Sequence, residues 1–126
     1  MKLENKTILL VEDDVVLCRM YQKALKIAGA AVVVALNGKD ALEQLVSKQI
    51  DLVVLDLMMP LMNGYETIRQ IKLDKKISHV PIIVLTNLDE HPEFVEKATG
   101  TKLEEYLVKS NTTIEEVIDK IAKHLN

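Results

Sequence analysis

Three short, uninterrupted apolar runs constrain most strongly how this chain can fold. They are rich in β-branched residues, lack polar alternation, and span Thr7–Val11, Leu52–Leu57 and Ile82–Thr86. Strands with this pattern are typical of a parallel sheet that is covered by helices on both faces. Two weaker runs, Ala31–Leu36 and Tyr106–Val108, are expected to be outer strands of the same sheet.

Amphipathic helices are predicted between these runs. The first should end at Gly29, which suits a left-handed C-terminal position, and Asn37 can cap the second. Pro92 is well placed in the first turn of a fourth helix, and Thr113 and Glu116 form a capping-box pattern before the last one. The third helix carries the apolar residues Tyr65, Ile68 and Ile71. Strand and helix therefore alternate five times, which predicts right-handed crossovers and a doubly wound α/β domain.

Length and composition favour one compact domain. The chain has 126 residues and a formal net charge of −3, so we expect a single domain over residues 1–126. No basic stripe with interleaved aromatic residues indicates a nucleic-acid partner, and no apolar run is long enough to insert in a membrane. Cys18 is the one cysteine, so a cytoplasmic location is expected. His79 and His124 are expected to face solvent.

Polar residues gather where the predicted strands end. In parallel α/β sheets the carboxyl ends of the strands form the rim at which ligands bind. Carboxylates about 4 Å apart at an effective dielectric near 20 repel by roughly 4 kcal/mol, and a hard cation such as Mg²⁺ would relieve that repulsion. A lysine ammonium and a threonine hydroxyl on the same rim could contact a phosphoryl group. The residues concerned are Glu12, Asp13, Asp14, Asp56, Thr86 and Lys109. Of these, Asp14 is expected to serve mainly as the cap of the first helix.

Four segments resemble the receiver domains of bacterial two-component response regulators, of the single-domain, chemotaxis-regulator-like type. They are Ile8–Asp14, Asp56–Gly64, Ile83–Thr86 and Tyr106–Lys109, in the family's order and approximate spacing. The resemblance covers essentially the whole chain. It implies a flavodoxin-like fold, with a five-stranded parallel sheet in the order 2-1-3-4-5 and five helices.

The resemblance also implies a magnesium site. Glu12 and Asp13 look like the family's acidic pair, and Asp56 would be a further ligand. Met58 would lend its backbone carbonyl to the ion. Mg²⁺ is thus the expected cofactor.

The remaining roles concern the phosphoryl group. By resemblance, Asp56 is the phosphoacceptor, and Lys109 and Thr86 contact the transferred group. Thr86 and Tyr106 look like the family's switch residues. As a carboxylate nucleophile, Asp56 would form an acyl phosphate, and the chain would assist its own modification and later hydrolysis rather than act as an enzyme.

The implied function is a stand-alone switch in two-component signalling. A sensor histidine kinase or a histidine phosphotransfer protein would be the donor, and a downstream protein the target. Direct nucleic-acid binding and membrane insertion are not expected. A homodimer that forms on phosphorylation is a further partner to consider.

Three features depart from the family pattern. Ser110 follows the lysine where a proline joined by a cis peptide is usual, which leaves open whether the Lys109–Ser110 bond is cis. Asn87 replaces a small residue after Thr86, and the segment Ala98–Glu105 is longer than usual. Ser110 and Asn87 favour an alternative, a degenerate receiver that acts only as a protein-interaction module.

Two other classes fit less well. A flavodoxin-like cofactor carrier would need a phosphate-binding loop after the first strand, where Glu12–Asp14 would instead repel phosphate. A metal-dependent phosphatase acting on small molecules would need a substrate pocket, of which the sequence holds no signature.

Overall fold

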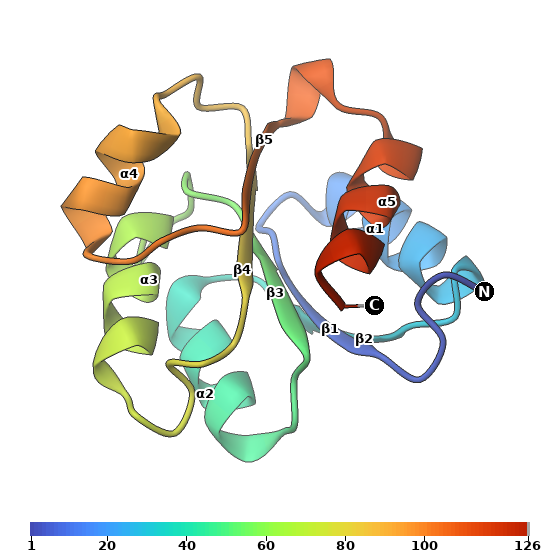
Figure 1. Cartoon of the computed structure of the whole chain (residues 1–126), viewed down its shortest axis with the longest axis horizontal. Coiled ribbons are helices and arrows are strands. Elements are labelled where there is room, and N and C mark those ends of the chain that lie inside the picture. The colour runs from blue at the N-terminus through green and yellow to red at the C-terminus, as the bar shows by residue number, and fades with distance from the viewer. Residues whose placement is uncertain (126) are drawn as a thin grey trace.

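The computed structural model describes residues 1–125, and these form a five-stranded parallel sheet with five α-helices. The strands lie in the order β2-β1-β3-β4-β5, as the resemblance predicted (Figure 1). The strands are β1 (Thr7–Val11), β2 (Ala31–Ala35), β3 (Leu52–Leu55), β4 (Ile82–Thr86) and β5 (Glu105–Val108). The helices are α1 (Val15–Ile27), α2 (Gly38–Ser47), α3 (Gly64–Leu73), α4 (Pro92–Thr99), α5 (Ile114–Leu125) and the short 3₁₀ helix η1 (Lys109–Asn111).

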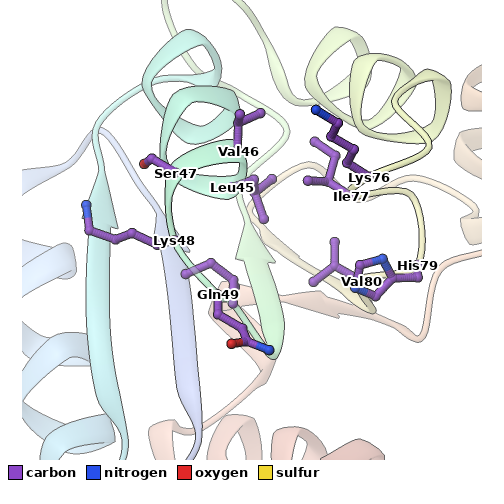
Figure 2. Close-up of a pocket in the computed structure, with 10 residues that line it drawn as sticks. Leu45, Val46, Ser47, Lys48, Gln49, Lys76, Ile77, His79 and Val80 are labelled. Atoms are coloured by element: carbon purple, nitrogen blue, oxygen red, sulfur yellow. The ribbon is translucent and has the colours of Figure 1, made fainter.

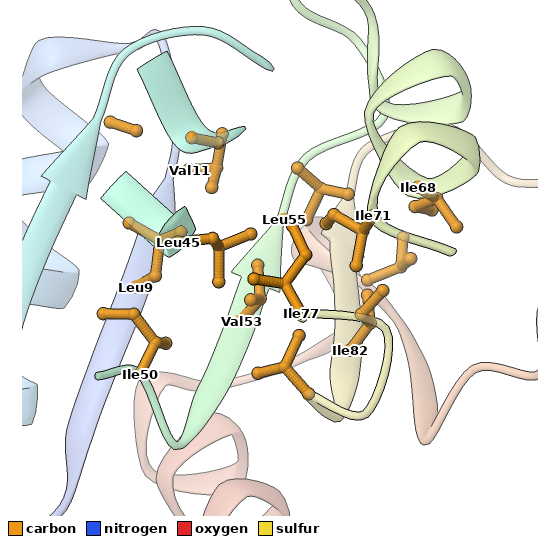
Figure 3. Packing of buried hydrophobic residues seen from close by; sticks show 14 of the residues in the cluster. Leu9, Val11, Leu45, Ile50, Val53, Leu55, Ile68, Ile71, Ile77 and Ile82 are labelled. Carbon is orange, nitrogen blue, oxygen red and sulfur yellow. The ribbon is translucent and has the colours of Figure 1, made fainter. Parts of the chain in front are cut away.

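Helices cover both faces of the sheet: α1 and α5 lie on one face, and α2, α3 and α4 lie on the other (Figure 1). Successive strand residues point to opposite faces, so Leu9 and Val11 join the second layer while Ile8 and Leu10 join the first. Figure 3 shows the cluster beneath α2 and α3, where Leu45 meets strand side chains. Both faces are buried, which is why the central strands read as unbroken apolar runs.

Most strand bounds agree with the predicted ones. β1 and β4 match, β2 ends one residue early, at Ala35, and β5 begins one residue early, at Glu105. Leu36, just beyond β2, is 47% exposed. β3 ends at Leu55 rather than Leu57, since the chain there turns into the loop that carries Asp56. Leu57 is nevertheless buried, so its apolar character serves packing rather than strand pairing.

The predicted caps are present. Asp14 accepts hydrogen bonds from the backbone N–H groups of Val16 and Leu17, at 3.0 and 3.1 Å. Thr113 and Glu116 form the reciprocal capping box, with both bonds at 3.1 Å. Asp14 is therefore the cap of α1, and its neighbours Glu12 and Asp13 are left for other contacts.

The two histidines differ. His79 is exposed, as predicted, but the prediction for His124 is wrong. Its ring Nε2 lies 2.7 Å from Glu105 Oε2, because the last turns of α5 pack beside β5. Within residues 1–125, no helix combines the length and the apolarity that crossing a bilayer requires.

Candidate functional site

Three carboxylates meet at the carboxyl ends of β1 and β3. Val11 and Leu55 are paired at the ends of these neighbouring strands, so the residues that follow them lie side by side. One carboxylate oxygen from each of Glu12, Asp13 and Asp56 lies within 4.8 Å of the others. Glu12 and Asp56 are buried and Asp13 is exposed, so the cluster opens to solvent on one side.

Lys109 joins this cluster from the end of β5. Its Nζ lies 2.9 Å from Asp56 Oδ2 and also donates a hydrogen bond to Glu12 Oε1. Its side chain is 8% exposed, so one buried ammonium is shared between two buried carboxylates. Burial lowers the pKa of Lys109, but the hydrogen bonds and charges of Glu12 and Asp56 outweigh burial and raise that pKa above its ordinary value. Lys109 therefore stays charged in the site.

Burial has opposite effects on the pKa values of Glu12 and Lys109, because it disfavours the charged form of each. Removal from water raises the pKa of the Glu12 carboxyl above the ordinary value, although Lys109 and the backbone N–H of Asp14 counteract this. That N–H donates to Glu12 Oε2 at 3.1 Å. A second positive ligand beside Glu12 would favour its charged form.

A backbone group also holds Asp56. The N–H of Met58 donates to Asp56 Oδ1 at 3.1 Å, while Lys109 binds Oδ2. Both carboxylate oxygens are therefore oriented before any ligand binds. Met58 lies beside the cluster as predicted; the role of its carbonyl as a metal ligand stays a prediction.

Thr86 and Tyr106 are connected through Leu88. Thr86 is fully buried, and its Oγ1 accepts a hydrogen bond from the Leu88 N–H at 3.3 Å. The Tyr106 hydroxyl donates to the Leu88 carbonyl at 2.5 Å. Burial raises the pKa of Tyr106 to about 12, so this hydroxyl keeps its proton. Sequence reasoning did not foresee the link, because a carbonyl acceptor leaves no side-chain signal.

The departures from the family pattern leave the lysine in place. The Lys109–Ser110 peptide bond is trans, and Lys109 begins η1. Lys109 still reaches both Glu12 and Asp56. Asn87 is exposed, and the longer segment before β5 is held in part by Glu96, whose side chain accepts the Leu103 N–H at 2.7 Å.

Gly64 packs directly against the backbone of the loop that carries Asp56. A Cβ on Gly64 would lie 2.5 Å from Leu57 Cα and 2.6 Å from the Asp56 carbonyl oxygen. The first turn of α3 therefore presses on the backbone that presents Asp56. The sequence showed an Asn63-Gly64 pair but not this close approach.

A second cavity lies at the other end of the sheet, between the end of α2 and the loop before β4 (Figure 2). Its volume is about 300 Å³, and its polar lining includes Lys48, Lys76 and His79. Ile50, which precedes β3, lines it, whereas Asp56 follows β3. The cavity is thus remote from the carboxylate cluster, and no acidic residue lines it.

Comparison with known proteins agrees with this geometry. Residues 8–122 match the response regulator receiver domain family. A probable transcriptional regulator ycf27 from Cyanidium caldarium is 35% identical over 117 residues, covering 86% of this chain and 45% of the relative. Hybrid signal transduction histidine kinase B from Dictyostelium discoideum is 35% identical over 94% of this chain and 7% of its own length. The chain spans less than half the length of these curated relatives.

Solved structures are similar over nearly the whole chain. The chemotaxis protein CheY4 of Vibrio cholerae has a TM-score of 0.83 at 26% identity, covering 96% of this chain and 98% of that one. The response regulator TrrA of Thermotoga maritima, solved in complex with Mg²⁺ and BeF, has a TM-score of 0.80 at 32% identity, covering 94% and 97%. With its family match, its sheet order and its cluster of acids and lysine, the chain belongs to the receiver domains of two-component response regulators.

Proposed function

We propose that this chain is a phosphoryl-accepting switch whose acceptor is Asp56. The observation that carries the proposal is the environment of this one buried carboxylate. Lys109 binds one of its oxygens at 2.9 Å, the Met58 N–H binds the other at 3.1 Å, and Glu12 and Asp13 lie beside it. These contacts hold the carboxylate in one orientation beside an ammonium and two further acids, and such positioning favours nucleophilic attack on a phosphoryl group.

The reaction would be transfer from a phosphohistidine. An Asp56 carboxylate oxygen attacks phosphorus, the P–N bond breaks, and the electron pair returns to the imidazole nitrogen of the donor. Lys109, already beside Asp56 Oδ2, lies where it can neutralise a phosphoryl oxygen. Each chain would accept one phosphoryl group and later lose it by hydrolysis of the acyl phosphate, and it would assist both steps. Because the chain is itself the acceptor, we do not class it as an enzyme.

The acidic cluster fits Mg²⁺. Its three carboxylates are hard oxygen ligands, and the one ammonium beside them binds only Glu12 and Asp56, which leaves net negative charge for a cation to offset. Glu12, Asp13, Asp56 and the Met58 carbonyl would hold the ion. When bound, Mg²⁺ would offset the negative charge that the carboxylates and the phosphoryl oxygens bring together.

A conformational readout would run through Thr86, Leu88 and Tyr106. Thr86 Oγ1 now accepts a hydrogen bond from the Leu88 N–H, and turning this side chain to donate its hydroxyl proton to the phosphoryl group would disturb that bond. Leu88 also accepts the Tyr106 hydroxyl, so movement of this loop would release or reposition Tyr106. The affected surface is formed by α4, β5 and α5. If Thr86→Ala still signals and the Tyr106 ring keeps one environment with and without the adduct, this coupling is wrong.

The proposed partners are proteins. The donor would be a sensor histidine kinase or a histidine phosphotransfer protein, which the similarity to a hybrid histidine kinase supports. Several relatives are named transcriptional regulators, and this chain spans less than half of their length. We propose that residues 1–126 themselves act in the cytoplasm as a stand-alone switch that contacts a protein target, not DNA, and that phosphorylation can promote a homodimer.

Intact mass after incubation with acetyl phosphate and Mg²⁺ tests the proposal. We expect one labile phosphoryl adduct on the wild-type chain, and none on Asp56→Asn or in the presence of a chelator. Asp89→Asn is the matched control, because Asp89 is an exposed acid that follows β4 at the same edge of the sheet, and it should keep the adduct. A wild-type chain that stays unmodified would instead support the interaction-module alternative.

A further inference from the structure

Helices α2 and α3 pack side by side and end at the edge of the sheet opposite to Asp56. Each helix follows a parallel strand and runs back along it, so its last turn lies where the strands begin. Apolar side chains stay exposed on these last turns: Val46 of α2 is 61% exposed and Leu73 of α3 is 75% exposed. The core-facing sides of the two helices are filled separately by Leu45 and Ile71. Val46 and Leu73 are therefore not needed to cover the sheet.

The two exposed side chains border one apolar groove. A hollow of about 430 Å³ lies between α2 and α3, and its apolar lining is Leu42, Val46, Leu73 and Ile77. The cavity of about 300 Å³ beyond the end of α2 shares Val46 and Ile77 with this hollow. Figure 2 shows Val46 on α2 and Ile77 on the loop before β4 across from each other. The two hollows therefore form one continuous α2–α3 groove.

The rim of the α2–α3 groove is basic. Lys48 follows α2, and Lys75 and Lys76 follow α3. All three are exposed; within residues 1–125 none forms a salt bridge, and Lys48 donates only to the neutral Gln44 side chain. Among the described residues that line the two hollows, Asp74 is the single acid, and its Oδ1 accepts the Lys76 N–H at 3.0 Å. The rim is thus locally positive, although the whole chain carries a net charge of −3.

Neighbouring charges do not reverse this balance. Glu43 and Lys72 are exposed on α2 and α3, line neither hollow, and are opposite in sign. Glu66, two turns before the end of α3, is paired with Arg69. Asp51 accepts a hydrogen bond from the first N–H of β1 at 2.7 Å, so it is turned toward the sheet. The groove therefore presents apolar surface beside uncompensated ammonium groups.

We propose that the α2–α3 groove docks an amphipathic, acidic helix of a partner protein. Apolar side chains three and four residues apart on that helix would contact Val46 and Leu73, and glutamates or aspartates beside them would pair with the lysines of the rim. An extended segment would gain less here, because α2 and α3 use their backbone groups internally and offer no ladder. A helix satisfies its own backbone groups.

Charge complementarity selects this occupant. A second copy placed here by a two-fold axis would bring lysine against lysine. A nucleic acid would meet the lysines, but it would gain nothing from Val46 and Leu73 and would be repelled by Asp74. An anionic membrane would contact the lysines without filling the groove. Because the groove lies at the opposite edge of the sheet from Asp56, docking does not depend on phosphorylation and would hold the switch beside its partner in both states.

Fluorescence anisotropy with a labelled synthetic peptide tests the docking. The peptide is about 18 residues long, with leucines three and four residues apart along one side and glutamates elsewhere. We expect saturable binding at chain concentrations below about 1 mM. Val46→Asp should weaken binding at least about tenfold, because it places a charge in the apolar centre. Ile27→Asp is the matched control: Ile27 is also β-branched and is 68% exposed at the end of α1, on the other face of the sheet, so binding should not change.

A second peptide, with lysines in place of the glutamates, tests the sign of the charge. It should bind at least about tenfold more weakly than the acidic peptide at about 0.15 M salt, where exposed charges act over roughly 8 Å. Lys75→Glu with Lys76→Glu should weaken the acidic peptide about tenfold and strengthen the basic one. Lys23→Glu with Lys26→Glu, two exposed positions on α1, makes the same change in net charge and should leave both affinities nearly unchanged.

Amide NMR titration with the acidic peptide locates the site, and shifts should centre on residues 42–50 and 70–80. All substituted residues are exposed, so every variant should unfold at nearly the wild-type temperature. Asp56→Asn should bind the peptide as the wild type does, and Val46→Asp should still form the adduct on Asp56. Failure of the docking proposal is therefore distinguishable from failure of the phosphoryl switch.

Four results would overturn the proposal: no binding of the acidic peptide, equal binding by Val46→Asp, preference for the basic peptide, or shifts confined to other regions. Duplex DNA and vesicles of anionic lipid serve as competing ligands. If either binds with the same dependence on Lys75 and Lys76 while the acidic peptide does not bind, the groove belongs to a nucleic acid or a membrane and the proposal is wrong.

Discussion

Lys109 and Asp56 form a buried ion pair, with Nζ 2.9 Å from Oδ2 and the two side chains 8% and 7% exposed. The same ammonium also binds Glu12, whose side chain is 3% exposed. One cation therefore holds two carboxylates that would otherwise face each other out of water. This relationship makes Lys109 a structural requirement as well as a proposed phosphoryl contact.

Removing this cation should be costly. We expect Lys109→Met to lower the free energy of unfolding by about 3 kcal/mol in the absence of divalent ions, because it leaves buried carboxylates uncompensated. Urea unfolding measures the change. Lys39→Met, an exposed position in α2, is the control and should change stability by less than about 0.5 kcal/mol. Adding Asp56→Asn to Lys109→Met should restore part of the loss; an additive double variant would contradict the shared-cation view.

Metal binding should depend on the exposed acid. Asp13→Asn should weaken Mg²⁺ binding by at least about tenfold, since a hard cation depends on the charge of each carboxylate ligand. The chain has no tryptophan, so amide NMR titration is the suitable measurement. Shifts should centre on residues 12–14 and 56–58, and shifts confined to other regions would argue against this site. Asp89→Asn should bind as the wild type does.

Tyr106 should make stability fall at high pH. Burial raises its folded pKa to about 12, whereas an unfolded tyrosine titrates near 10. The folded state therefore favours the neutral phenol, and its contribution is complete below pH about 10 and is lost as pH rises through about 12. Phenolate absorbance follows the titration. Tyr106→Phe should lose the transition near pH 12 and show a flatter dependence of stability on pH in that window; an unchanged titration curve would rule out this assignment.

The lifetime of the acyl phosphate should reflect two apolar neighbours. Met58 is 58% exposed, Leu88 is half-buried, and both line one groove with Asp13. Neither side chain can orient a water for in-line attack. We expect Met58→Asn with Leu88→Glu to accelerate adduct loss by about tenfold, equal to roughly 1.4 kcal/mol of barrier.

Decay of the phosphorylated protein after donor removal, at fixed Mg²⁺, measures that rate. Leu61→Asn is a suitable control, because Leu61 lies in the same loop, is 88% exposed, and has a φ of +66° that asparagine tolerates. Its decay should match the wild type. An equal or slower decay in the double variant would assign water access to Asn87 or to the loop after Lys109.

Gly64 should tolerate no side chain. The close approach of its Cβ position to Leu57 and to the Asp56 carbonyl leads us to expect that Gly64→Ala lowers the free energy of unfolding by about 2 kcal/mol. Gly100→Ala is the comparison: nothing lies within 4 Å of its Cβ position, and only its φ of +70° opposes the change, by about 1 kcal/mol. Chemical denaturation compares the two, and a larger loss at Gly100 would contradict the packing argument.

Local patterns were sufficient for most of the fold. Strands covered on both faces must be apolar throughout, so β1 and β4 could be read to the residue. The caps at Asp14 and Thr113 depend on contacts within four residues, and they too were predictable. The end of β3 was not, because Leu57 is apolar for packing reasons although it lies beyond the strand.

The residues of the candidate site could also be predicted from the sequence, because parallel strands bring their carboxyl ends to one edge and polar residues follow those ends. The contacts among these residues could not be predicted. That Lys109 is shared between Glu12 and Asp56, and that Leu88 links Thr86 to Tyr106, depends on distances between segments far apart in the chain. Sequence periodicity states which residues share one side of one helix or strand, whereas the packing of segments far apart in the chain decides which side chains meet.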